Sequence, residues 1–170
     1  LNGTDKETCE LAKKWADSLG PKQGIEKLRV LGMTDALIDY MLDRNEFEEA
    51  FKLSGEAAKH KVPDVHLRYA LYLEDERRFK EAEEHFIKAG KPSEAINMYE
   101  HQKDFHSALL VARQYGDPAS VISILMTQGK MFLEKRDYAK AENCFIQAKK
   151  PEVAVKMYTD MGNYPEVIFI

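Results

Sequence analysis

A stretch of about thirty residues occurs twice in the chain, and this repetition restricts the possible folds more than any other feature. The first copy covers residues 70–99 and the second covers residues 129–158, so equivalent residues are 59 positions apart. Identical or similar residues recur at this offset, including Phe79/Tyr138, Ala82/Ala141, Phe86/Phe145, Pro92/Pro151 and Tyr99/Tyr158. Self-similarity at a fixed period is typical of a repeat architecture, in which each unit buries its apolar face against the next.

A shorter motif, an aromatic residue followed three positions later by a small one, subdivides this repeat. It begins at Phe47, Phe79, Phe105, Tyr138 and Tyr164, with spacings of 32, 26, 33 and 26 residues. The pattern around Gly129, Phe132 and Tyr138 matches the tetratricopeptide repeat, a helix-turn-helix unit of about 34 residues. The sequence therefore predicts an all-α fold, a right-handed α-solenoid of tetratricopeptide-like antiparallel helix pairs.

Eight residues are predicted to pack the repeats together. Alanine permits a close approach of two helices, and phenylalanine one turn later fills the space between neighbouring pairs. The predicted repeat-packing positions are Phe79, Ala82, Phe86, Ala89, Tyr138, Ala141, Phe145 and Ala148.

Turn residues and apolar periodicity predict about twelve helices and no sheet. Thr4 to Glu7 is typical of a capping box, Thr34 is expected to cap a helix, and Asp117 is expected to cap another. The expected helices cover approximately residues 4–19, 22–31, 34–42, 46–59, 65–76 with Pro63 at a first helical position, 79–89, 92–102, 105–115, 118–134, 138–148, 151–161 and 164 onward. Two- or three-residue connections between most of them favour antiparallel neighbours.

The chain of 170 residues is expected to form one tetratricopeptide-like helical repeat segment over residues 1–170. It begins with Leu1 rather than Met and ends on the apolar residues Val167–Ile170, whereas a finished solenoid carries polar capping repeats. We therefore expect a fragment of a longer solenoid. The net charge is −4 with both signs intermixed, which argues against nucleic-acid binding. The two cysteines, Cys9 and Cys144, are far apart and favour a reducing compartment.

No arrangement of residues predicts a catalytic site, a metal site or a cofactor. The five histidines show no metal-ligand spacing and are expected at the surface or at helix ends. Cys144 stands at the place of His85 in the other copy, and a partly buried packing thiol is favoured over a nucleophile. Phosphate-binding glycine motifs are absent from the sequence, and the acidic pairs are typical of solvated helix faces.

Two further groups could bind partners, although a structural role is favoured for both. The charged runs 74–78 and 59–61 could be docking patches but are more typical of solvated helix ends. The aromatic residues could line a peptide groove, but packing between helices is favoured. These aromatic residues are Trp15, Tyr40, Phe47, Phe51, Tyr69 and Tyr72.

Several strings resemble one family closely over essentially the whole chain. They are residues 11–15, 60–61, 65–70, 72–76, 79–83, 86–92 and 149–151, together with Ala95, Met98 and Tyr99. This pattern resembles the tetratricopeptide solenoid of the largest subunit of the intraflagellar transport B complex, a family with β-propellers ahead of a long helical solenoid. One departure is Phe169, where a polar residue is expected.

The resemblance implies a non-catalytic scaffold, supporting protein transport along ciliary microtubules and cilium assembly. It also implies other intraflagellar transport subunits as partners, no nucleic acid, no small-molecule substrate and at most an indirect association with membranes. The implied location is the cilium or flagellum, including its base and tip, and the cytoplasm.

Two alternatives stay open: a vesicle-coat-type trafficking scaffold and a generic peptide-binding tetratricopeptide adaptor. Leu71 and Lys130 stand where such an adaptor would carry a clamping asparagine, which argues against its carboxylate clamp.

Overall fold

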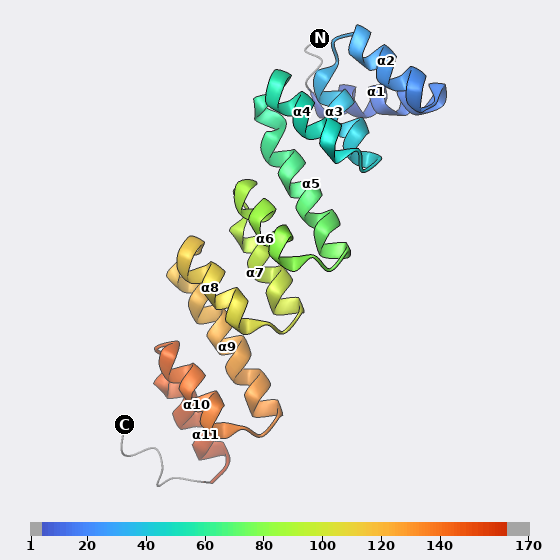
Figure 1. Cartoon of the computed structure of the whole chain (residues 1–170). Helices are drawn as coiled ribbons and strands as arrows, with labels where there is room; N and C mark the ends of the chain where they lie inside the picture. Colours follow the sequence, from blue (N-terminus) through green and yellow to red (C-terminus); the bar gives the residue numbers. More distant parts are fainter. Residues whose placement is uncertain (1–4, 163–170) are drawn as a thin grey trace. The chain divides into compact units, whose positions relative to one another are not determined.

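The computed structural model describes residues 5–162, which form eleven α-helices and one short 3₁₀-helix, with no strand among them (Figure 1). The helices are α1 (Lys6–Leu19), α2 (Pro21–Val30), α3 (Thr34–Asp43), α4 (Phe47–Ala57), the 3₁₀-helix η1 (Lys59–Lys61), α5 (Val62–Asp75), α6 (Phe79–Lys88), α7 (Pro92–His101), α8 (Phe105–Tyr115), α9 (Pro118–Glu134), α10 (Tyr138–Gln147) and α11 (Pro151–Asp160). The helix expected from residue 164 onward, with Tyr164 and Phe169, lies outside the described residues.

Backbone contacts divide the chain into two compact units, Leu1–Lys91 and Pro92–Ile170. In the first unit α1, α2 and α3 contact one another, and the contacts then run from α3 to α4, α4 to α5 and α5 to α6. In the second unit each helix from α7 to α11 packs against its neighbour in the chain. The predicted all-α fold of consecutively packed helices, as in an α-solenoid, is confirmed.

Aspartate side chains cap several helices. The Asp117 carboxylate accepts a hydrogen bond of 2.7 Å from the Ser120 backbone N–H, as predicted. Two other expected caps are wrong. Asp5 caps α1 by accepting from the Thr8 N–H, and Thr34 is already the first helical residue after Met33, which offers no side-chain hydrogen bond. The expected helix at 46–59 also ends early, at Ala57, and η1 follows it.

Nine described turns or helix ends use a left-handed backbone conformation, and only four of them use glycine. The other five are Asn45, Arg77, Lys103, Arg136 and Lys149, with φ between 57° and 60°. Lys149 is equivalent to Gly90, which adopts φ 70° in the first copy. A non-glycine residue is strained in this conformation, so the turn geometry is imposed by the helices that it joins.

Fully buried alanine and phenylalanine residues pack α5 against α6 and α9 against α10. Phe86 and Phe145 are both fully buried. Phe145 faces Gly129 of α9, and at the equivalent position the first copy has Ala70. A Cβ atom on Gly129 would lie 2.5 Å from Cε1 of Phe145, so a side chain at this position would require the ring or α9 to shift.

Candidate functional site

Nowhere in residues 5–162 do three or more histidine, cysteine or acidic side chains converge as metal ligands would. Cys9 and Cys144 are both buried free thiols, and burial raises the pKa of each. A raised pKa keeps the thiol protonated and poorly nucleophilic. The predicted packing role of Cys144 fits this environment. No helix in the described part of the chain has the length and apolar character needed to span a membrane.

An aromatic cluster fills the space between α4, α5 and α6. The Phe51 ring of α4 lies 4.8 Å from the His66 ring, 5.7 Å from the Tyr69 ring and 5.8 Å from the His85 ring, measured between centroids. The Tyr69 ring also lies edge-on to His85 at 4.7 Å. These distances are those of attractive aromatic pairs, so the cluster joins three successive helices.

His66 and His85 contact each other within this cluster, and both are half-buried. His85 lies in the last turn of α6, as expected for a helix end, whereas His66 lies within α5. Their Nδ1 atoms are 2.8 Å apart, so one ring donates and the other accepts a hydrogen bond. Burial lowers the pKa of both histidines, and the charge of Lys88 lowers each further. The hydrogen bond needs at least one neutral ring, and the lowered pKa values keep the pair neutral near pH 7.

The other predicted aromatic residues divide between core and surface. Phe47 packs on Tyr69 and Tyr72 at 4.8 and 5.1 Å, and Tyr40 is almost fully buried in the core. The favoured role in packing is therefore correct for these residues. It is wrong for Trp15, which is 41% exposed.

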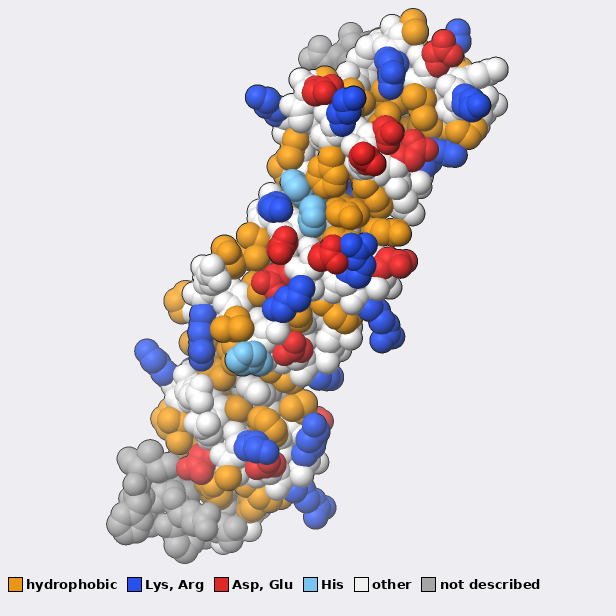
Figure 2. Space-filling view, viewed as in Figure 1, with side chains coloured by type: hydrophobic (Ala, Val, Ile, Leu, Met, Phe, Trp, Pro, Cys, Tyr) orange, Lys and Arg blue, Asp and Glu red, His pale blue; other side chains and the backbone are white. Residues whose placement is uncertain are grey.

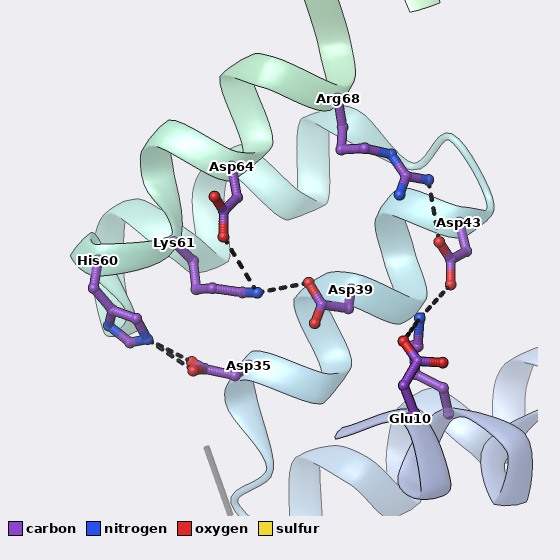
Figure 3. A network of polar contacts seen from close by, with 9 residues as sticks. Glu10, Asp35, Asp39, Asp43, His60, Lys61, Asp64 and Arg68 are labelled. Atoms are coloured by element: carbon purple, nitrogen blue, oxygen red, sulfur yellow. Dashed lines mark hydrogen bonds and ion pairs between the residues drawn. The ribbon is translucent and has the colours of Figure 1, made fainter. Parts of the chain in front are cut away.

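A network of ion pairs connects α1, α3, η1 and α5 (Figure 3). Asp35, Asp39 and Asp43 occur at four-residue intervals on α3, so they share one face of that helix. Figure 3 shows each of these carboxylates facing a basic side chain from another element. The partners are His60 for Asp35, Lys61 for Asp39, and both Arg68 and Lys13 for Asp43.

The shortest of these ion pairs are close and partly shielded from water. Lys61 Nζ lies 2.7 Å from Asp39, and the Lys61 side chain is only 15% exposed. Burial acts to lower the pKa of Lys61, but the hydrogen bond to Asp39 and the negative charges of the nearby aspartates together outweigh it and hold the pKa above its usual value. The network lines a recess of about 400 Å³ in which the bases Lys13, Lys61 and Arg68 each meet a carboxylate. It therefore joins helices α1, α3 and α5, and its acids do not form a free anionic site.

The second unit contains a groove of different chemistry, with a volume of about 470 Å³, lined by α8, α9 and α10. Its apolar lining consists of Leu109, Leu125, Phe132 and Cys144. The remaining lining residues are the amides Gln128, Asn143 and Gln147 and the bases Arg113 and Lys140, without any acid. This groove has no sequence motif, since it depends on the residues at a few positions of three helices that meet only in the folded chain.

The predicted repeat-packing positions differ in burial. Ala82, Phe86, Ala141, Phe145 and Ala148 are buried, whereas Phe79, Ala89 and Tyr138 are half-buried. Their role in packing one repeat against another stays a prediction. Elsewhere, Figure 2 shows basic and acidic side chains interspersed on the face that it displays, without a continuous basic surface there.

Comparison with known proteins finds related chains in distant organisms. The chain is 45% identical over 151 residues to intraflagellar transport protein 172 of Chlamydomonas reinhardtii, an alignment that covers 89% of this chain and 8% of that protein. It is 42% identical over 160 residues to the Homo sapiens homologue of that protein, covering 94% of this chain and 9% of the homologue.

A more distant relative is intraflagellar transport protein osm-1 of Caenorhabditis elegans, 28% identical over 156 residues, covering 92% of this chain and 9% of that protein. The chain thus spans about a tenth of the length of the relatives that it matches. No protein-family model matches the chain.

Proposed function

The chain belongs to the intraflagellar transport protein 172 family, and we propose that it is a non-catalytic scaffold segment of intraflagellar transport. It covers about a tenth of the length of the relatives that it matches. The observation that carries the proposal is the 45% identity to the Chlamydomonas protein across 89% of the chain. The segment would support protein transport along ciliary microtubules and cilium assembly. It would act in the cilium or flagellum, including the base and tip, and in the cytoplasm.

Binding rather than bond chemistry is the activity that the arrangement of residues supports. The acids Asp39 and Asp43 are held by basic partners within 3.1 Å, and the buried thiol of Cys144 has a raised pKa. These groups stabilise helix contacts and are not poised as acids, bases or nucleophiles. Stacked helices expose a long surface for protein partners, and we propose other intraflagellar transport subunits as those partners.

Replacement of this segment within the full-length protein tests the proposal. In ciliated cells, α5–α11 (Val62–Asp160) would be exchanged for an unrelated array of helical repeats of equal helix number. We expect short or absent cilia and loss of the protein from transport complexes, with normal secretory traffic. The control is the unaltered protein expressed at the same level.

The same experiment separates the alternatives. A vesicle-coat scaffold would instead give a secretory defect in cells without cilia, and a generic peptide adaptor would give neither defect. Normal cilia with a stably expressed replacement protein would contradict the proposal.

A further inference from the structure

The groove of the second unit lies between helices α8, α9 and α10, which are equivalent in the repeat to α4, α5 and α6 of the first unit. Between those three helices of the first unit, aromatic rings fill the space. At the repeat offset of 59, Leu125, Gln128 and Cys144 are equivalent to His66, Tyr69 and His85. Alignment of the motifs that begin at Phe47 and Phe105 places Leu109 at the position of Phe51. Four ring-bearing residues are thus replaced by four residues without rings, and the space between α8, α9 and α10 stays open.

We propose that this groove binds an extended segment of a partner protein in which an apolar residue stands between two acidic ones, in the order acid-x-apolar-x-acid. The volume of about 470 Å³ falls within the range of ligand-binding clefts and suits a few side chains. The inference rests on the proposed scaffold function, since it names one contact through which such a scaffold would hold a partner.

The apolar residue is specified by the floor of the groove. Leu125 is 3% exposed, and the half-buried side chains of Leu109 and Phe132 extend the same apolar surface. From Leu125 to Phe132 the helix advances about 10 Å. An extended peptide covers that length with about three residues, and its alternate side chains point to one face.

The acidic residues are specified by charge. Arg113 forms no ion pair with any described residue, and no acid lines the groove. Lys140 lies 5.5 Å from the centre of the Phe132 ring, and it also contacts Asp137 at 2.8 Å. Because Arg113 precedes the turn into α9 whereas Phe132 lies near the end of α9, the two bases lie toward opposite ends of the groove. Acids at the first and fifth positions of an extended peptide are about 13 Å apart and face the same side.

Amide groups can hold the peptide backbone. Gln147 donates a hydrogen bond of 3.1 Å from Nε2 to Oδ1 of Asn143. That bond leaves the nitrogen of Asn143 and the oxygen of Gln147 as a donor and an acceptor for a backbone C=O and N–H. The recess of the first unit differs, because acids line it together with bases, and Lys13, Lys61 and Arg68 already contact those acids.

The probe is a fluorescein-labelled peptide with the core Glu-Ser-Leu-Ser-Glu, titrated with the chain and followed by fluorescence anisotropy. We expect saturable binding that weakens with salt, and no binding of peptides with lysine for glutamate or serine for leucine. Arg113→Glu should weaken binding at least about fivefold. The matched control is Lys130→Glu, an equal charge change on an exposed residue of α9 that does not line the groove, and it should change the affinity less than about twofold.

A second variant fills the groove without reversing a charge. Leu109→Phe with Gln128→Tyr introduces rings that the first unit already accommodates, so helicity and thermal stability should be retained while binding is lost. Absence of saturable binding to the unaltered chain, or equal weakening by Arg113→Glu and Lys130→Glu, would overturn the inference. That outcome is distinct from failure of the proposed function, in which the segment binds the peptide but cilia form normally without it.

Discussion

The helix triplets α4–α6 and α8–α10 have matching helices but different contents between them. In the first, Phe51, His66 and His85 form a packed aromatic cluster. In the second, Leu109 and Cys144 stand at two of these places and line an open groove. The fully buried alanines and phenylalanines are kept in both triplets. Close helix contacts thus depend on a few small and large residues, and the remaining interior positions can be either filled or left open.

The largest effect should come from the two equivalent phenylalanines. Phe86→Ala and Phe145→Ala each remove a fully buried ring and should lower the free energy of unfolding by about 3–5 kcal/mol. Hydrogen exchange measured by mass spectrometry would report each unit separately. A cost in one triplet more than twice that in the other would contradict their equivalence.

The two equivalent alanines test close helix contact. Ala82→Leu and Ala141→Leu should each overpack a fully buried site and cost about 1–3 kcal/mol. Lys140→Leu is the control, since that exposed position should change stability by no more than about 0.5 kcal/mol. Urea unfolding of the three variants provides the measurement, and equal shifts in all three would show that the helix faces are misassigned.

A smaller effect is expected at the turn where Gly90 of one copy corresponds to Lys149 of the other. Both residues have positive φ, 70° and 57°. Gly90→Ala should therefore destabilise by about 1 kcal/mol, and Lys149→Gly should stabilise by up to about 1 kcal/mol. Thermal melts would test the opposite signs. A loss of stability from Lys149→Gly would mean that its side chain contributes more than the turn strain costs.

The smallest effect is pH dependence, which should have opposite directions in the two triplets. A histidine with a lowered pKa binds fewer protons folded than unfolded, so stability rises with pH. The stabilisation that comes from keeping His66 and His85 neutral should be complete above about pH 6.5. It should be lost as the pH falls through the lowered pKa values of the two rings. Burial raises the pKa of Cys144, so the protonated thiol is favoured in the folded chain. The stabilisation from this thiol should be complete below its ordinary pKa of 9.0 and lost as the pH rises through the raised pKa.

Hydrogen exchange as a function of pH would measure both responses. The double variant His66→Leu with His85→Cys carries the residues of the second triplet and should remove the acidic response of the first. Persistence of that response in the double variant would assign it to other groups.

Repetition in the sequence was sufficient to predict most helices, because the offset of 59 residues and the proline and aspartate signals mark where helices begin. The cap at Thr34 was mispredicted because the preference of threonine for helix starts does not decide which of two neighbouring residues is the last one before the helix, and here that residue is Met33. Turns at Arg77 and Arg136 gave no signal, since arginine rarely adopts positive φ and both residues do so here.

The side chains that meet between the helices were harder to predict than the helices themselves. His66 and His85 are 19 residues apart in the chain, and no spacing rule indicates that their Nδ1 atoms meet. The groove of the second unit likewise appears only when Leu109, Gln128 and Cys144 come together from three helices. Comparison of equivalent positions was the one available signal, because Cys144 in place of His85 removes a ring.

The neighbour-to-neighbour packing of the helices has a kinetic consequence. Within each unit most of the extensive contacts between described helices join elements adjacent in the chain, apart from α1 with α3 and α4 with α5 across the short η1. Little chain must be closed before such contacts form, so the entropic barrier to folding is low. Folding can begin at any helix pair and spread in either direction. A nascent chain could therefore complete the aromatic cluster of α4–α6 while the residues that form α8–α10 are still being synthesised.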